Sequence, residues 1–121
     1  MLLGQIVVHR YSNEGIGVIL QRDTDNITAQ FESGAIITST PELIIELTSF
    51  EARSVQLDSN NIRITNERIK KMRLAEAEAK RLNNMYALVH LGNNIKRLKR
   101  VVKKDYDFLK NTFGIDYQIH S

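Results

Sequence analysis

The first part of the chain alternates between apolar and polar residues in short runs, which is the pattern of half-buried β-strands. Four such runs cover residues 5–10, 15–21, 26–31 and 35–38. Between the second and third runs, Asp23-Thr24-Asp25-Asn26 has the composition of a hairpin turn, because Asp and Asn side chains bond their own backbone and tolerate left-handed geometry. Short strands at this spacing predict a small antiparallel β-barrel or a curled sheet.

The pattern becomes less regular after the fourth run. Ser39-Thr40-Pro41-Glu42 is typical of a capping box before one or two helical turns, and residues 42–48 fit either a strand or a helix. Two alternating apolar stretches, residues 55–57 and 62–64, then flank the turn-like sequence of residues 58–61. We expect this stretch to form a further β-hairpin at the end of the β part.

The second half of the chain has the pattern of helices. Residues 66–90 contain neither Pro nor Gly, and Thr65 is a suitable N-cap for a helix that begins there. Leu91-Gly92-Asn93-Asn94 is expected to end this helix, because Gly and Asn are common at helix C-termini. Asn94 would then cap a second helix over residues 95–113.

These elements predict an α+β fold in which a small antiparallel β-barrel or curled sheet precedes two long antiparallel α-helices. The β part is expected over residues 1–64, and the helical hairpin, over residues 65–121, is expected to carry oligomerisation and ligand binding. A chain of 121 residues is large enough for one compact unit of this kind.

The first predicted helix has a heptad seam, with apolar residues spaced alternately by three and four positions. A helix of about 25 residues is about 37 Å long, which is more than a small barrel can cover. The uncovered apolar surface predicts self-association as a homodimer or a higher assembly, a hexamer among them. The expected oligomer interface consists of Met72, Ala75, Ala79, Leu82 and Tyr86.

Composition excludes several classes of protein. The chain has no Cys, so disulfide frameworks and thiolate chemistry are excluded. No apolar run approaches the roughly 18 residues that a membrane span needs, and the start of the chain lacks the long apolar stretch of a signal peptide. We therefore expect a protein of the cytoplasm, which would be the host cytoplasm if the protein is viral, with no membrane partner.

Charge is distributed unevenly along the chain. Residues 1–60 carry three basic and eight acidic residues, whereas residues 61–121 carry fourteen basic and six acidic ones. A strongly basic half indicates an anionic partner, such as a nucleotide or a nucleic acid. The alternative is that the acidic half neutralises the basic half within the chain or between subunits.

Residues 96–104 are the strongest local candidate for chemistry, because six of these nine residues are cationic. On a helix, Arg97, Arg100 and Lys104 form one line that is suited to phosphates. Asn93 and Asn94 would add donors at the expected helix N-terminus, a position that favours anions, and His90 stands close enough in sequence to reach a phosphate. The alternative is an ordinary solvated helix face.

A second candidate lies in the loop after the first strand. Arg10, Tyr11 and Asn13 offer a cation, a stacking face and hydrogen-bonding groups, which together suit a base or a ribose. By contrast, Tyr86 and Tyr106 fall on apolar stripes and are expected in the core. No acid–base pair, nucleophile or metal-ligand spacing stands out, so we expect neither an enzyme nor a metal or cofactor site.

Residues 4–38 resemble the Tudor-like barrel, related to SH3 barrels, at the C-terminus of repair helicases. The residues that carry this resemblance are Gly4, Val7, His9, Gly15-Ile16-Gly17-Val18 and Phe31-Glu32-Ser33-Gly34. The sequence departs from that family in a longer spacing between His9 and Gly15. In that family the barrel is a docking module for RNA polymerase, which would make this chain a nucleic-acid or polymerase adaptor.

The segment from Ile6 to Val18, together with the layout of a curled sheet and two C-terminal helices, also resembles the viral Thoeris anti-defence sponge proteins of the first family of that name. This resemblance implies a symmetric oligomer that sequesters a cyclic ADP-ribose-type or cyclic oligonucleotide signal without turnover. We therefore expect a non-enzymatic protein that binds a small phosphate-bearing nucleotide and counteracts bacterial anti-phage signalling. The alternatives are the adaptor described above, with nucleic acid as the second choice of partner, and a purely structural assembly protein.

Overall fold

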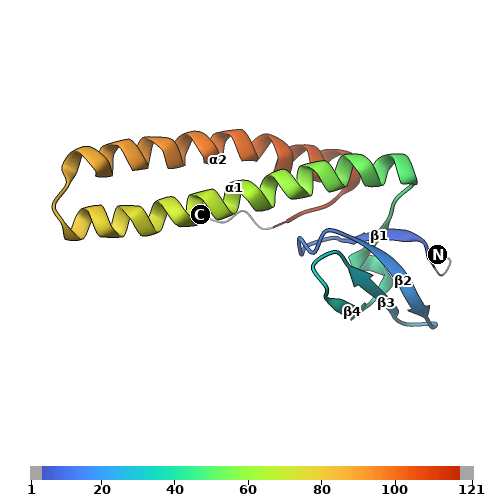
Figure 1. The fold of residues 1–121 in the computed structure, drawn as a ribbon. Helices are drawn as coiled ribbons and strands as arrows, with labels where there is room; N and C mark the ends of the chain where they lie inside the picture. The colour runs from blue at the N-terminus through green and yellow to red at the C-terminus, as the bar shows by residue number, and fades with distance from the viewer. Residues whose placement is uncertain (1–3, 118–121) are drawn as a thin grey trace.

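The computed structural model describes residues 4–117 and has an α+β fold, as the sequence predicts (Figure 1). Five strands form one antiparallel sheet in the order β4-β3-β2-β1-β5. The strands are β1 (Ile6–His9), β2 (Ile16–Arg22), β3 (Ile27–Phe31), β4 (Ile36–Ser39) and β5 (Ile44–Glu46). Two long helices follow, α1 (Ser49–Arg81) and α2 (Met85–Phe113).

The sheet is held by its own small core, in which alternate residues of the strands are buried. Gly17 of β2 lies in this core directly opposite Phe31 of β3, with which it pairs across the two strands. A Cβ atom at position 17 would lie 2.7 Å from the Phe31 ring and 2.8 Å from the carbonyl oxygen of Gln30. Only glycine therefore allows β2 and β3 to pack this closely.

The segment before the helices resolves the choice left open for residues 42–48. Residues Pro41–Leu43 form a single 3-10 turn, and Thr40 at its N-cap makes no side-chain cap hydrogen bond, so the expected capping box is absent there. Ile44–Glu46 then pairs antiparallel with β1 as strand β5.

Helix α1 begins at Ser49, so the expected β-hairpin around residues 58–61 and the expected cap at Thr65 are wrong. Thr48 is the N-cap, and it forms a full capping box with Glu51. Four residues of α1 with the helical spacing of three, four and three are buried, namely Ala52, Val55, Ser59 and Ile62. The boundary between sheet and helices therefore lies near residue 48 and not at residue 64.

The turn between the helices lies at Leu82–Asn84, so the expected break at Leu91-Gly92-Asn93-Asn94 is also wrong. Asn83 takes the left-handed conformation with φ 56°, and the side chain of Asn84 accepts a hydrogen bond from the backbone of Ala87 as the N-cap of α2. Gly92 stays inside α2 and lies half-buried near Glu76 of α1, with room for a Cβ atom 3.8 Å from the nearest carboxylate oxygen. A single glycine weakens a helix without ending it.

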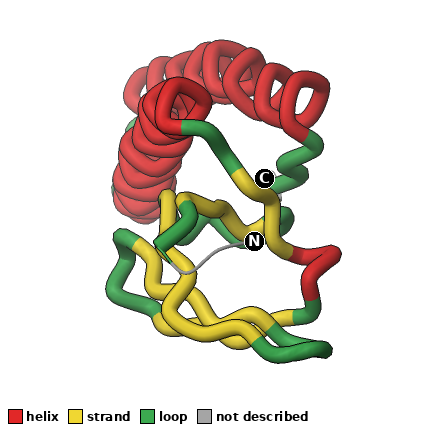
Figure 2. Tube along the Cα trace, turned by 90° about the vertical axis from the view of Figure 1, so that its right-hand side faces the viewer, coloured by secondary structure: helices red, strands yellow, loops and turns green. Residues whose placement is uncertain are grey.

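The two helices pack along their length and share a core with the sheet, so that the sheet lies under one end of the hairpin while the other end projects beyond it (Figures 1 and 2). This shared core consists of Val8, Leu47, Ala52, Val55, Ile62, Val102, Tyr106, Leu109, Ile115 and Tyr117. Among residues 4–117, no helix is long and apolar enough to cross a membrane.

The predicted heptad seam is only partly correct. Ala79 is buried and Met72 is half-buried within the single chain, whereas Ala75, Leu82 and Tyr86 are exposed. The seam is interrupted because α1 ends at Arg81, so that Leu82 lies in the turn and Tyr86 lies at the start of a different helix. The expectation that Tyr86 is a core residue is wrong, since its side chain is 84% exposed.

Candidate functional site

The loop between β1 and β2 is shaped by His9. The backbone N–H groups of Tyr11 and Ser12 both donate to Nδ1 of His9, at 3.1 Å each. Burial lowers the pKa of His9, against the opposing effect of the Glu14 carboxylate, which favours the neutral ring that this acceptor role requires. His9 therefore fixes the backbone from which Tyr11 and the next two side chains project.

Glu14 closes the other end of this loop. Its carboxylate accepts hydrogen bonds from the hydroxyl groups of Ser33 and Ser12, which lower its pKa. Gly15 follows with φ +79°, where a side chain would be strained and would meet Glu32. The loop is thus anchored to the β3–β4 turn and holds its shape without a ligand.

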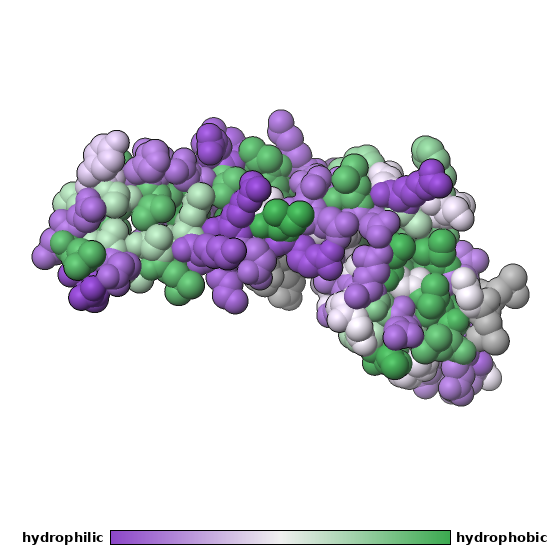
Figure 3. Space-filling view, viewed as in Figure 1, coloured by the Kyte–Doolittle hydropathy of each residue, from purple (hydrophilic) through white to green (hydrophobic). Residues whose placement is uncertain are grey.

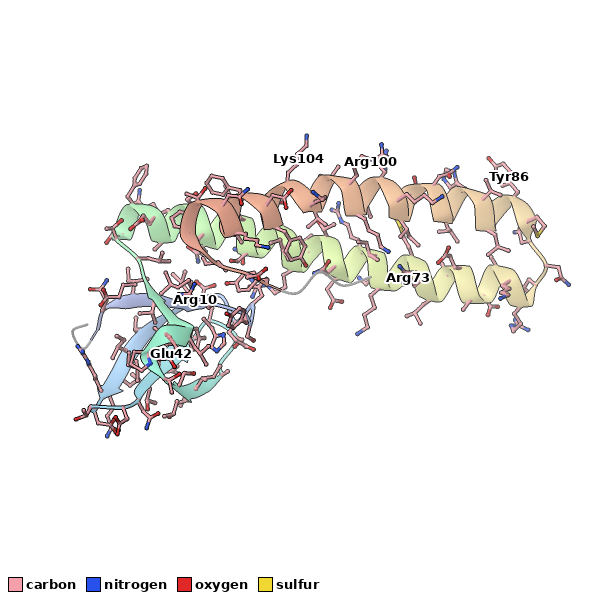
Figure 4. The ribbon with its side chains drawn as sticks, turned by 180° about the vertical axis from the view of Figure 1, so that it is seen from behind. Arg10, Glu42, Arg73, Tyr86, Arg100 and Lys104 are labelled. Carbon is pink, nitrogen blue, oxygen red and sulfur yellow. The ribbon has the colours of Figure 1, made fainter. Side chains whose placement is uncertain are left out.

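Arg10 ties the loop to the C-terminal segment of the chain. Its guanidinium donates to the carbonyl oxygen of Glu42 at 2.9 Å and to that of Gly114 at 3.2 Å, and its own carbonyl oxygen accepts from the backbone of Asp116 at 2.7 Å (Figure 4). Gly114 ends α2 in the left-handed conformation, so the chain turns back towards the sheet there. This return places Tyr117 against α1.

A cavity of about 380 Å³ lies where the loop, the two helices and the C-terminal segment meet. Asn66 of α1 donates to the hydroxyl of Tyr106 of α2 at 3.0 Å across it, and Nδ2 of Asn13 donates to the carbonyl oxygen of Ser59 at 3.2 Å. The lining residues are Tyr11, Ser12, Asn13, Ile62, Asn66, Tyr106 and Tyr117.

Three buried polar atoms in this region have no hydrogen-bond partner among the described residues: Oδ1 of Asn13 and the hydroxyl of Tyr117, which belong to lining residues, and Oγ of Ser59, which does not line the cavity. Ser59 is 1% exposed and Tyr117 is 5% exposed. Ser59 lies close enough to offset part of the rise in pKa that burial causes at Tyr117, but the two hydroxyl groups do not make a bond of normal geometry. Unsatisfied buried groups cost about 1–3 kcal/mol each, so a ligand or water that pairs with them is favoured.

The chemistry of this cavity is neutral and planar. Three tyrosines, two amides and one serine hydroxyl line it, and none of its lining residues carries a formal charge at neutral pH. Such a lining suits stacking on a flat polar ring and hydrogen bonding at the ring edge. Its lining residues do not form an acid–base pair among themselves, and the Ser12 hydroxyl donates to the Glu14 carboxylate of the same loop.

The residues expected to bind base or ribose have different outcomes. Tyr11, which is half-exposed, and Asn13 both line the cavity, so the structure brings these two together. Arg10 does not join them, because its guanidinium is used to hold Glu42 and Gly114. A sequence shows that an arginine stands in a loop but not that two carbonyl groups from distant segments converge on it.

The predicted phosphate site does not exist in the form expected. Because α2 is continuous, Asn93 and Asn94 lie inside a helix, where their backbone N–H groups are used, and no helix N-terminus stands beside them. His90 is exposed on α2 and stacks on Tyr86, with ring centroids 6.3 Å apart.

The predicted phosphate-binding cations lie apart from the cavity. Arg100 and Lys104 point away from α1 and from the sheet on the outer side of α2 (Figure 4), and Arg97 shares their exposure. Within residues 4–117 these three side chains make no hydrogen bond and no ion pair. They are therefore not neutralised by the carboxylates of the same chain.

Five cavity residues are not among the site residues predicted from the sequence: Ser12, Ile62, Asn66, Tyr106 and Tyr117. Tyr106 was expected in the core, and its ring is indeed buried, but its hydroxyl also faces Asn66. Asn66 is the one residue that carried a usable signal, because it is a polar residue on the buried face of α1, one turn after Ile62.

A pair of titratable side chains lies between the helices. Asp58 of α1 and Asp105 of α2 are both partly buried and share a hydrogen bond. Burial raises the pKa of Asp58 to about 6, and the hydrogen bond and negative charge of Asp105 add to the shift. Among the described residues, no group of three or more His, Cys, Asp or Glu side chains is placed to hold a metal ion.

In comparisons with known proteins, no family model, no curated protein and no solved structure matches the chain.

Proposed function

We propose that this protein binds a small nucleotide without chemical turnover, with the base or the ribose in the cavity between the loop, the hairpin and the C-terminal segment. The observation that carries this proposal is the pair of unpartnered polar atoms at the cavity, Oδ1 of Asn13 and the hydroxyl of Tyr117. A preformed acceptor and a preformed donor beside stacking rings suit the polar edge of a base.

The phosphates would lie towards the projecting end of the hairpin. Lys70 is one helical turn beyond Asn66 on α1, and Lys103 is one turn before Tyr106 on α2, so both follow the cavity in the same direction. Lys103 pairs at 2.9 Å with Asp107, an exposed pair that a phosphate can displace at little cost. This arrangement replaces Arg97, Arg100 and Lys104 as the expected phosphate ligands.

The neutral lining and the absence of an acid–base pair there favour capture over catalysis. Sequestration of a cyclic ADP-ribose-type or cyclic oligonucleotide signal, which the resemblance to the anti-defence sponge proteins implies, fits a site of this kind because a sponge needs slow release and no turnover. Sequestration of such a nucleotide signal in the cell is therefore part of this proposal.

The test compares Tyr117→Phe with Tyr86→Phe. The Tyr117→Phe variant removes only an unpartnered buried hydroxyl, so the free protein should melt at an equal or higher temperature while nucleotide affinity falls about tenfold. The Tyr86→Phe control removes an exposed hydroxyl at the hairpin tip and should change neither. Native mass spectrometry of freshly purified protein, followed by calorimetric titration with AMP, ADP-ribose and a cyclic dinucleotide, provides the readout.

The proposal fails if no nucleotide co-purifies and none of the three titrants binds. It also fails if a titrant binds equally well to the wild type, to Tyr117→Phe and to Asn13→Ala, because binding would then occur outside the cavity.

A further inference from the structure

The middle of the helical hairpin carries an unusual concentration of positive charge. Residues 63–73 of α1 and 96–104 of α2 together hold eleven Lys and Arg side chains and only one carboxylate, Glu67. We call this section the cationic belt. Its cations are Arg63, Arg68, Lys70, Lys71, Arg73, Lys96, Arg97, Lys99, Arg100, Lys103 and Lys104.

The two halves of the cationic belt lie side by side. The helices are antiparallel and joined at Leu82–Asn84, so residues at similar distances from this turn share the same height along the hairpin. The belt spans roughly 15 Å of the hairpin axis at 1.5 Å per residue. Figure 3 shows hydrophilic side chains gathered across the middle of the hairpin, and Figure 4 shows Arg100 and Lys104 projecting from α2 while Arg73 comes from α1 on the same stretch.

These cations are exposed, and the chain does not neutralise them. Ten of the eleven are exposed and Lys99 is half-buried. Lys103 pairs with Asp107, and Arg63 donates to Asn60, but within residues 4–117 the other nine make no hydrogen bond and no ion pair. Cations three or four residues apart on a helix lie within the screening length of about 8 Å at physiological salt, so their mutual repulsion opposes folding and a bound anion would relieve it.

Few acidic residues of the chain lie where they could neutralise the cationic belt. Most of the carboxylates of residues 4–48 lie on the strands and turns of the sheet, which covers only the other end of the hairpin (Figures 1 and 2). Residues 83–104, which run from the turn between the helices to the end of the belt on α2, contain no acidic residue. The belt is therefore a surface with a strong excess of positive charge, offset only in part by Glu67 and by Asp107, which pairs with Lys103.

The amount and placement of charge distinguish between partners. A small nucleotide carries two or three negative charges, far fewer than this belt offers. A flat anionic membrane would meet one face only, whereas these cations come from both helices. A chain of regularly spaced phosphates is the anion that such a belt matches best, and the guanidinium forks of Arg97 and Arg100 suit phosphate oxygens.

We propose that the cationic belt binds the phosphate backbone of a nucleic acid without sequence preference. This goes beyond small-nucleotide capture at the cavity. The two sites share Lys70 and Lys103, whereas Arg97, Arg100 and Lys104 of the belt take no part in nucleotide binding at the cavity. Contacts of this kind position a protein on a nucleic acid and lose affinity steeply as salt displaces them.

The experiment measures fluorescence anisotropy of labelled 20-base-pair DNA and RNA duplexes, and of a single strand of the same length, between 50 and 300 mM salt. With about five phosphates contacted, the logarithm of the association constant should fall with the logarithm of the salt concentration with a slope of about −4. A triple variant, Arg97→Gln with Arg100→Gln and Lys104→Gln, should lose at least about tenfold in affinity and should flatten the slope by about 2 to 3.

The matched control removes three positive charges outside the belt, by Lys80→Gln with Arg81→Gln and Lys110→Gln. These residues lie on the same two helices and leave the same net charge, so the control should lose less than about threefold. Circular dichroism and melting temperatures check that both triple variants remain folded. If the triple belt variant does not fold, the single variants Arg97→Gln and Arg100→Gln are measured in its place.

Three results would overturn the proposal: no binding of any of the three oligonucleotides at 50 mM salt, equal losses in the belt variant and the control, or equally tight and equally belt-dependent binding to polyaspartate or to phosphatidylserine vesicles. The cavity variant Tyr117→Phe should leave oligonucleotide affinity unchanged, and the belt variant should leave binding of AMP at the cavity unchanged. Failure of one proposal is thus distinguishable from failure of the other.

Discussion

Asp58 shows how a single side chain makes the stability of this protein depend on pH. Its pKa is raised to about 6 by burial and by Asp105, while an unfolded aspartate titrates near 4. Between these two values the folded state binds more protons than the unfolded state, so this group stabilises the fold at acidic pH. That contribution is lost as the pH rises through about 6.

We predict that Asp58→Asn stabilises the protein more at pH 7 than at pH 5. The asparagine removes the repulsion from Asp105 that is present only at the higher pH, and after discounting for solvent screening the difference in the free energy of unfolding should be at most about 1 kcal/mol. Urea denaturation at both pH values measures it, with Asp107→Asn, an exposed carboxylate on α2, as the control. A stabilisation that does not change with pH would contradict this assignment.

The cavity illustrates what residue-level reading of a sequence can and cannot find. Tyr11 and Asn13 were predictable as neighbours because both stand in one short loop of the sequence. Tyr117 was not predictable, because its place depends on Gly114 reversing the chain and on Arg10 holding the returning segment. Sites assembled from distant segments leave no periodic signal in the sequence.

At the level of elements, the strands were predicted well and the start of α1 was not. The pairs Val55 with Leu57 and Ile62 with Ile64 read as alternation, but in the structure Val55 and Ile62 are buried while Leu57 and Ile64 are 63% and 54% exposed. An apolar pair two residues apart fits a strand face or two different sides of a helix. The deciding signal was the capping box at Thr48 and Glu51, which lies outside the alternating stretch.

This capping box gives a prediction for α1. Thr48→Ala removes the acceptor for the N–H of Glu51 and should lower the free energy of unfolding by about 1 kcal/mol. Thr65→Ala is the control, since Thr65 lies inside α1, where alanine is an equal or better helix former. Thermal denaturation followed by circular dichroism compares the two. If Thr65→Ala lowered the free energy of unfolding more than Thr48→Ala, the helix would begin at Thr65, as the sequence alone predicts.

At the scale of the whole molecule, self-association remains a prediction. The projecting tip of the hairpin exposes Leu82, Met85, Tyr86 and Val89, an apolar group that no described part of the chain covers. Ala79, which was expected at the oligomer interface, is buried within the chain, so the tip is the better place to test that expectation.

If the tip holds subunits together, Tyr86→Glu should reduce the native mass measured by light scattering without lowering the melting temperature, because Tyr86 is exposed in the single chain. Phe50→Glu, an equally exposed aromatic residue at the start of α1, serves as the comparison. An unchanged mass for Tyr86→Glu, or an equal drop for both variants, would remove the tip from the interface.

The hydrogen bonds from Arg10 to the segment after α2 also bear on how the chain folds. The bond to Gly114 joins residues 104 positions apart in sequence, whereas the pairing of neighbouring strands and of the two helices needs much shorter loops. Closing a loop of that length costs more entropy than either local event, so this join is expected to form after the sheet and the hairpin have each taken shape. The order of assembly therefore leaves the walls of the cavity to be completed last, when two preformed halves dock.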